Sequence, residues 1–295
     1  MEILQFDISG KFAHFRKYYA NNTALSYSIP PRTTIMGMLA AILGKSRDSY
    51  YQELSSKNIR IGIALKVPVK KNFHRLNLLS IKSLGDMSKS FESDFRKMSG
   101  NSIQTPFEIV TGLDLQKSEV RYRIFISCFE EGMNIFNQLK NNLASQGQVY
   151  PVTLGVANFN AFITNYKCFA QENIIEKKVA GEVIAFNSAV DSEKISELQF
   201  DKEEFEMSFV EEELLTADFK ADGDREVSKM NRVLFTSNDI PLKVRYTGTF
   251  YSIQDVDSLQ TIQFLDYWYI ILIAKPFLIN LNEELNFFRI ILREY

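Results

Sequence analysis

Strand-like and helix-like periodicity alternate through the first 170 residues in the order strand, helix, strand, strand, helix, strand. Alternating apolar residues mark the strands, and apolar residues three and four apart mark the helices. The last segment is predicted only as extended. The segments occupy residues 2–8, 32–44, 58–68, 119–129, 131–145 and 160–169. This order is typical of the ferredoxin-like fold used by RNA-recognition modules, so it predicts an α+β domain.

We expect the two helices to cover one face of the sheet and to leave the other face open. Arg121, Arg123 and Phe125 alternate along one predicted strand and would share this open face. Two arginines and an aromatic ring suit phosphate pairing and base stacking. The alternative is that Phe125 belongs to the core and the arginines lie on ordinary surface.

Residues 69–117 form a long insertion between two predicted strands and show little periodicity. Such an insertion in a compact domain is usually functional or disordered. Apolar residues among the basic ones favour a hairpin, and the alternative is a mobile, solvated loop. Its candidate phosphate contacts are Lys70, Lys71, Arg75, Lys82, Lys89, Arg96 and Lys97.

The formal net charge of −2 hides two oppositely charged regions. Residues 1–97 hold 16 Lys and Arg against 7 Asp and Glu, whereas residues 172–226 hold 6 against 17. A basic front and an acidic rear indicate an anionic ligand on one part of the chain. The alternative is two differently solvated surfaces.

The helix predicted from residue 32 begins with Pro30-Pro31-Arg32-Thr33-Thr34. The prolines disfavour helix before residue 31 and fix how the chain enters it. Arg32, Thr33 and Thr34 then stand at a helix N-terminus, where free N–H groups and the helix dipole favour an anion. A purely structural cap is the alternative.

The familiar catalytic motifs of nucleotide-binding proteins, metalloproteases and thiol redox proteins are absent from the sequence. The two histidines, His14 and His74, exclude a multi-histidine metal site. Either one could act as the general base of a metal-free ribonuclease, with Lys or Tyr stabilising the transition state. Cys128 and Cys168 fit neither a disulfide framework nor a metal site. We therefore expect no metal and no cofactor.

From about residue 170 the composition becomes acidic and mixed. Residues 232–253 predict short strands joined by turns at Asn238-Asp239 and Thr247-Gly248. We expect a smaller β-rich domain packed against the first. The N-terminus lacks the pattern of a signal peptide, and the apolar run 267–279 is too short to span a membrane. These features predict a soluble cytoplasmic protein in a reducing compartment.

Four segments together resemble CRISPR-associated protein family five of the RAMP superfamily. GKFAHFRKYYANNTALSYSIPPRTTIMGMLAAILG (10–44) is the most specific. TPFEIV…VRYRIFIS (105–127), YPVTLGVANFNAF (150–162) and VLFTSNDIPLKVRYTGTFYSI…IQFL (233–265) follow in the family's order. The pattern is closest to the type I-B branch.

The resemblance implies a ferredoxin-like domain over 1–165, with a long hairpin thumb at about 70–117, and a smaller β-rich domain over 166–265. It also implies a non-catalytic subunit that caps the 5′ handle of the crRNA in a type I Cascade complex. Its partners would be the family-seven backbone subunit, the large subunit and, through the assembled complex, target DNA. The I-C branch itself cuts precursor crRNA, so a metal-independent endoribonuclease using His14 or His74 is the alternative.

By position, the resemblance carries His14, Arg16, Arg32, Thr33 and Thr34 over to this chain. Residues 266–295 depart from the family as an apolar and amphipathic tail of unknown role. The predicted RNA-binding residues are Arg16, Lys17, Arg32, Thr33, Thr34, Arg121, Arg123 and the seven basic residues of the insertion.

Overall fold

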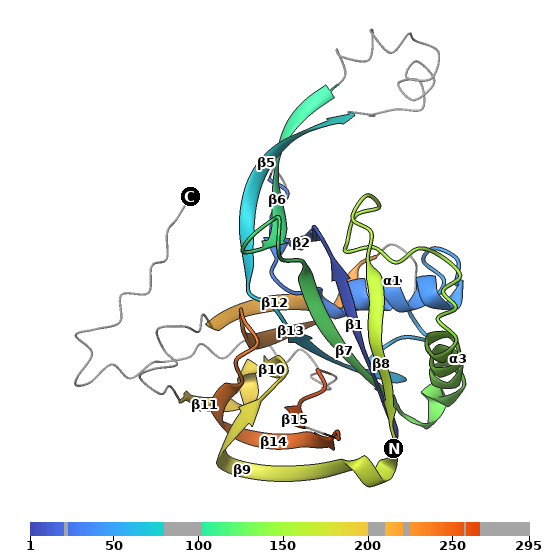
Figure 1. The fold of residues 1–295 in the computed structure, drawn as a ribbon, viewed down its shortest axis with the longest axis vertical. Coiled ribbons are helices and arrows are strands. Elements are labelled where there is room, and N and C mark those ends of the chain that lie inside the picture. The colour runs from blue at the N-terminus through green and yellow to red at the C-terminus, as the bar shows by residue number, and fades with distance from the viewer. Residues whose placement is uncertain (21–22, 80–101, 200–209, 221–224, 257, 266–295) are drawn as a thin grey trace, which may run out of the picture.

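The fold is mixed, with mostly β-strands and two α-helices among the residues described (Figure 1). The computed structural model describes residues 1–20, 23–79, 102–199, 210–220, 225–256 and 258–265. This arrangement confirms the predicted α+β class. The predicted tail, 266–295, and the predicted contacts Lys82, Lys89, Arg96 and Lys97 lie outside the described residues.

A four-stranded sheet with two helices is built from the segments predicted in the sequence. Its strands lie in the order β4-β7-β1-β8, and each neighbouring pair is antiparallel. Each of the six elements overlaps its predicted segment. They are β1 (Ile3–Gly10), α1 (Arg32–Leu43), β4 (Ile59–Leu65), β7 (Val120–Cys128), α3 (Met133–Ala144) and β8 (Phe162–Phe169).

Both ends of α1 follow from the local sequence. Pro31 precedes the helix with an extended backbone (φ −57°, ψ 155°). Its ring fixes its own φ and disfavours the helical region for Pro30 before it. Gly44 ends the helix in the left-handed region at φ 72°, and its N–H donates to the carbonyls of Ala40 and Ala41. The helix therefore begins and ends where proline and glycine place it.

An antiparallel hairpin projects from the sheet between β4 and β7 (Figure 1). Its strands, β5 (Val69–Leu79) and β6 (Ser102–Gly112), pair residue by residue from Val69 and Gly112 outward. Near its base, Phe107 and Ile109 pack against Ala24. Two short strands, β2 (Phe15–Arg16) and β3 (Ser26–Tyr27), pair with each other. The expected hairpin therefore forms in the basic insertion.

The rest of the described chain forms two further sheets. One has the order β10-β13-β12, and in the other β14 pairs with β9, β11 and β15. The strands are β9 (Ile174–Phe186), β10 (Val190–Asp191), β11 (Ile195–Leu198), β12 (Val210–Phe219), β13 (Val227–Thr236), β14 (Leu242–Gln254) and β15 (Leu259–Ile262). The turn predicted at Thr247-Gly248 is wrong, because β14 continues through it with a register shift against β9.

The face of the four-stranded sheet opposite the helices is covered, so the prediction of an open face is wrong. Phe125 is fully buried and packs in one cluster with Ile3, Tyr251, Ile253 and other apolar residues of β14, β15 and their flanks. The covering strands come from the β-rich part of the chain, which supplies apolar side chains to this face. Of the two readings of Phe125, the core reading is confirmed.

The largest apolar core joins the two predicted domains. It includes residues of α1, α3 and the sheet, together with Leu215, Val233, Phe235 and Leu265 from the β-rich part. The outer edge of β4 is also capped, because Ala189 and Leu265 donate backbone N–H groups to β4 carbonyls. The division at residue 165 stays a prediction, and the two parts share one hydrophobic interior.

Candidate nucleic-acid interface

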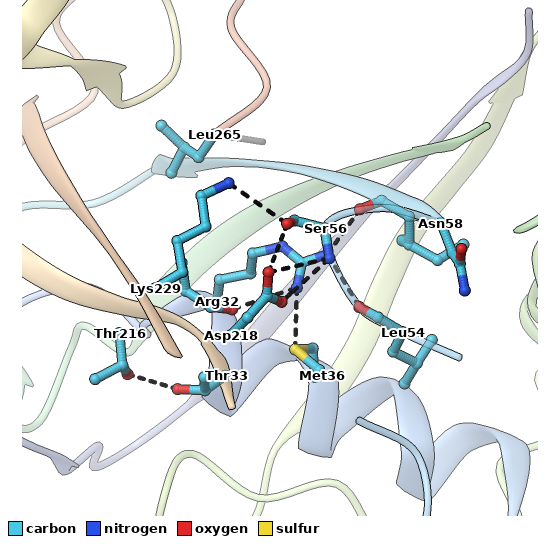
Figure 2. A network of polar contacts seen from close by, with 12 residues as sticks. Arg32, Thr33, Met36, Leu54, Ser56, Asn58, Thr216, Asp218, Lys229 and Leu265 are labelled. Carbon is cyan, nitrogen blue, oxygen red and sulfur yellow. Dashed lines mark hydrogen bonds and ion pairs between the residues drawn. The ribbon is translucent and has the colours of Figure 1, made fainter. Parts of the chain in front are cut away.

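The guanidinium of Arg32 lies inside the molecule at the start of α1 (Figure 2). Its side chain is 2% exposed, and Nη1 forms an ion pair with Asp218 Oδ1 at 2.8 Å. Nη2 donates to the carbonyls of Leu54 at 3.0 Å and Ile59 at 2.7 Å. The anion that pairs with the Arg32 side chain is therefore a carboxylate of the same chain.

The network around Asp218 fastens the start of α1 to the β-rich part. Asp218 also accepts hydrogen bonds from the backbone N–H and the hydroxyl of Ser56, and Lys229 Nζ donates to Ser56 Oγ at 3.4 Å (Figure 2). Beside it, the hydroxyls of Thr33 and Thr216 share a hydrogen bond of 2.6 Å. The position of the helix start therefore depends on β12 and β13.

Two adjoining cavities, of about 450 and 320 Å³, open beside this helix start, and together they are called the groove below. Thr33, Thr34, Gly155, Phe219 and Arg225 line both cavities. Other lining residues belong to one cavity only: His14, Arg16, Tyr18 and Phe107 to the larger, and Gly37, Tyr50 and Tyr51 to the smaller. The groove therefore runs from the base of the hairpin along the first turns of α1.

The groove needs a glycine at position 155. Gly155 has φ +94°, and a Cβ placed on it would lie 1.8 Å from the backbone oxygen of His14. The segment around Gly155 consequently packs its backbone directly against the backbone of residue 14. The predicted family segment 150–162 thus forms one wall of the groove.

His14 lines the larger cavity but is itself 3% exposed. Its Nδ1 lies 2.7 Å from the carbonyl oxygen of Glu108, so Nδ1–H is the donor. Its ring stacks on Phe107 with a centroid distance of 3.9 Å. Burial lowers the pKa of His14, which favours the neutral ring. In that form Nε2 carries the free lone pair.

His74 is brought near His14 by the hairpin. It lies on β5 directly opposite Phe107, the residue that stacks on His14. Unlike His14, His74 is exposed. The two predicted histidines therefore both adjoin Phe107, His14 by ring stacking and His74 by strand pairing, although 60 residues separate them in the sequence.

Arg16 and Arg225 are the cationic side chains that line the groove. Arg16 is exposed, and its Nη2 donates to the carbonyl of Ala20 at 3.1 Å. Arg225 is half-exposed and contacts Asp48 Oδ1 through Nε at 2.9 Å and Nη2 at 2.7 Å. Hydrogen bonds from Tyr51 and then Arg225 lower the pKa of Asp48. Arg16 thus offers its charge to a ligand more freely than Arg225 does.

Lys17 and Lys71 face acidic residues of β12. Lys17 Nζ lies 2.7 Å from Glu213 Oε1, and Lys71 Nζ lies 3.5 Å from the same oxygen. Burial lowers the pKa of Lys17, but the hydrogen bond and charge of Glu213 outweigh it and raise the pKa overall. Part of the predicted basic front is therefore paired with the acidic rear.

On the hairpin, Lys70 and Arg75 are exposed, and Phe73 between them is 61% exposed. Arg75 shares the strand face of the Phe73 ring, and a cation beside an exposed ring suits a single-stranded nucleic acid, whereas Lys70 points to the other face. On β7, Arg121 is exposed, but Arg123 contacts Asp7 at 2.7 and 3.0 Å and Gln260 at 3.1 Å. Arg121 and Arg123 do not share an open face, because β14 and β15 cover that side.

Most of the groove residues were missed in the sequence, among them Tyr18, Phe107, Gly155 and Arg225. Tyr18 follows Arg16-Lys17, and that run of two cations and a tyrosine was the available signal. Phe107 and Gly155 lie inside segments that resemble the family, but nothing local marks them as groove residues. Arg225 lies in the most acidic part of the chain, so charge patterning pointed away from it.

Among the described residues, no group of three His, Cys, Asp or Glu side chains is placed to hold a metal ion. Cys128 and Cys168 are free thiols. None of the helices in this part of the chain is long and apolar enough to cross a membrane.

The family model described as CRISPR-associated protein (Cas_Cas5) matches residues 3–164, more than half of the chain. The chain belongs to this CRISPR-associated family. The matched residues include the four-stranded sheet up to β8, the hairpin and the part of the groove formed by β2, α1 and residues 153–156. The family resemblance read from the sequence is therefore confirmed. No curated protein sequence matches the chain significantly.

Solved structures also resemble the chain. A CRISPR protein from Archaeoglobus fulgidus superposes with a TM-score of 0.51 at 13% identity, covering 89% of this chain and 99% of that one. This likeness supports a shared fold. A chain of a CRISPR RNA-guided surveillance complex has a TM-score of 0.43 at 11% identity, over 81% of this chain and 91% of that chain. A chain of a Type III-B Cmr-beta complex bound to cognate target RNA and AMPPnP has 0.36 at 13% identity, over 83% and 86%. These two scores are too low to add to the fold assignment.

Proposed function

We propose that this chain is a non-catalytic subunit of a type I CRISPR surveillance complex, of the I-B kind, that binds and caps the 5′ handle of crRNA. The observation that carries the proposal is the groove: a helix start with two threonines, an exposed arginine and aromatic rings, at the base of a basic hairpin. Backbone phosphates suit the cations and the helix start, and bases suit the rings. Family membership gives the groove its CRISPR context.

The proposal also includes the domain architecture that the family resemblance implies. The strand order β4-β7-β1-β8 with antiparallel neighbours supports a ferredoxin-like domain over 1–165, and the β5–β6 hairpin corresponds to the thumb. The β-rich domain, 166–265, packs against it. In the assembled complex the chain contacts the family-seven backbone subunit and the large subunit. Target DNA is a partner through the assembled complex. The complex supports antiviral defence in the cytoplasm.

The RNA site is tested with the full chain and the repeat RNA encoded in the CRISPR array of the same genome. We expect binding to weaken steeply as salt rises, because phosphate contacts release counterions. Arg16→Gln should lower the affinity and reduce the salt slope by about 0.7. Lys177→Gln is the matched control, because Lys177 is exposed on β9, outside the groove. A flat salt response, or equal effects of the two variants, contradicts the proposal.

A metal-independent endoribonuclease that processes pre-crRNA is the second candidate. His14 favours it, because its neutral ring lines the groove with Nε2 free to accept a proton. The test is incubation of repeat RNA with the full chain in EDTA. His14→Gln keeps a donor for the Glu108 carbonyl but cannot act as a base. Specific cleavage that disappears in His14→Gln or His74→Ala would overturn the non-catalytic assignment.

A further inference from the structure

Two glutamates on β12, Glu211 and Glu213, point toward the basic N-terminal region and are called the acidic pair. Glu213 contacts Lys17 Nζ through both carboxylate oxygens, at 2.7 and 3.0 Å. Lys71 Nζ lies 3.5 Å from Glu213 and 3.8 Å from Glu211. Ser28 Oγ donates to Glu211 at 2.6 Å. One strand of the acidic region thus holds two cations that were predicted to bind RNA.

The Lys17–Glu213 ion pair is largely shielded from water. The side chain of Lys17 is 15% exposed and that of Glu213 is 10% exposed. Lys17 Nζ also lies over the rings of Tyr27 and Tyr19, at 5.4 and 5.7 Å from their centroids. A phosphate could use this ammonium only by displacing a carboxylate that already contacts it in a partly buried site.

The acidic pair lies next to the groove along the backbone, although Glu211, Glu213, Lys17 and Lys71 do not themselves line either cavity. Lys17 lies between Arg16 and Tyr18, which both line the larger cavity, and β12 continues from Glu213 to Thr216, which lines it too. A phosphate that approaches Lys17 or Lys71 therefore meets negative charge beside each ammonium. A phosphate that approaches Arg16 meets a cation whose guanidinium, among the described residues, donates to the carbonyl of Ala20 and pairs with no carboxylate.

We infer that Glu213, assisted by Glu211, determines the RNA selectivity of the groove by keeping Lys17 and Lys71 from phosphates. Unrelated RNA binds mainly through phosphate contacts, which are independent of sequence, whereas the correct RNA is also held in one register by its shape and bases, so a blocked phosphate contact lowers affinity for unrelated RNA more. Binding then depends more on the shape and bases that fit the groove. This inference rests on the proposed RNA-binding function.

Glu212 provides the matched control. It lies between the members of the acidic pair on the same strand, so its side chain points to the opposite face and is exposed. Glu212→Gln and Glu213→Gln make the same change in composition and net charge. Only Glu213→Gln removes a negative charge that contacts Lys17 and Lys71. A difference between the two variants therefore reports the ion pairs and not the overall charge.

The experiment measures binding of the full chain to two probes, the repeat RNA and a uridine 20-mer, over a series of salt concentrations. For Glu213→Gln we expect the salt slope to steepen by about 0.7 to 1.4, as one or two phosphates gain a partner. Affinity for the uridine 20-mer should rise about two- to fivefold and exceed the gain for repeat RNA. Glu212→Gln should leave the slope and the ratio of affinities unchanged.

A second variant provides an independent test if Glu213→Gln lowers the stability of the fold. Glu211→Gln alters a less buried carboxylate, 32% exposed, that lies near Lys71. It should shift selectivity in the same direction by a smaller amount. Replacing Lys17 by Gln in the Glu213→Gln chain should remove part of the gain in affinity for the uridine 20-mer. Circular dichroism of each variant verifies the fold.

The two proposals fail in different ways. If the wild-type chain binds repeat RNA with a steep salt slope but Glu213→Gln and Glu211→Gln behave like Glu212→Gln, the inference is overturned and the proposed function stands. If the wild-type chain binds neither probe, both are overturned. If Glu213→Gln weakens binding to both probes while the fold is intact, the acidic pair supports the RNA site and does not restrict it.

Discussion

Single positions decide whether the groove exists. Gly155 and Gly181 both adopt positive φ, +94° and +83°, which L side chains rarely adopt. They differ in what surrounds them: a Cβ at Gly155 meets the backbone of His14, and a Cβ at Gly181 meets nothing within 4 Å. This pair separates the effect of backbone conformation from that of close packing.

Gly155→Ala should destabilise the chain more than Gly181→Ala. The left-handed conformation alone costs about 1–2 kcal/mol at either site, and the clash at residue 155 adds about 1–3 kcal/mol. Urea unfolding of both variants measures the difference in the free energy of unfolding. Equal losses would show that the 153–156 segment moves away from His14 at little cost.

The buried ring of His14 should make stability depend on pH. Because burial lowers its pKa below the ordinary 6.5, the unfolded chain binds a proton more readily than the folded one. The contribution is complete above about pH 6.5 and is lost as the pH falls through the lowered folded pKa, with a slope of at most about 1.4 kcal/mol per pH unit.

The measurement is the free energy of unfolding of the wild-type chain and His14→Gln between pH 7.5 and pH 5. The difference between the two should shrink as the pH falls. His74→Gln, at an exposed position, is the control and should follow the wild-type curve. A difference between wild type and His14→Gln that stays constant with pH would contradict the buried neutral ring.

At the scale of elements, α1 is placed by contacts at its first turn. Arg32 joins it to the segment before β4 and to β12, and Thr33 joins it to β12 again through Thr216. The described part of the hairpin, in contrast, contacts the rest of the molecule through Phe107 and Ile109, and it exposes Lys70 at its base and Arg75 further along β5. One element is thus held by a buried polar network, and the other presents charge to solvent.

Arg32→Met should cost about 3–5 kcal/mol, because it leaves Asp218 buried without its cation. Adding Asp218→Asn should recover part of this loss, since the amide still accepts from Ser56. Arg245→Met is the control: Arg245 pairs with Glu197 on the surface, where water screens the pair and its loss should change stability little. Chemical denaturation measures all three; a loss at Arg32 no larger than at Arg245 would contradict the buried network.

At the scale of the whole molecule, the β-rich part buries surfaces of the four-stranded sheet. Its residues cover one face of the sheet, contribute to the core on the other and cap the edge of β4. Its acidic strand also pairs with the basic front. The opposite charges of the two regions, read in the sequence as a sign of an anionic ligand, are partly complementary within the chain.

The full chain should therefore unfold in one cooperative transition, and residues 1–169 alone should not fold cooperatively. The fragment would expose the apolar face around Phe125 and lose several core residues. Thermal unfolding and binding of a hydrophobic dye report these properties. A fragment that unfolds as sharply as the full chain would establish two independent domains.

Patterns along the chain were enough to predict the class of fold, the order and approximate bounds of six elements, the hairpin in the basic insertion, and the family. These features depend on local periodicity, on proline and glycine, and on ordered motifs, all of which can be read from residues close together in the sequence. The tertiary structure decided which charges meet. Arg32 and Asp218 lie 186 residues apart in sequence, and Lys17 and Glu213 lie 196 apart. An ionic contact depends on distance in space, and a charge count along the chain carries no such distance.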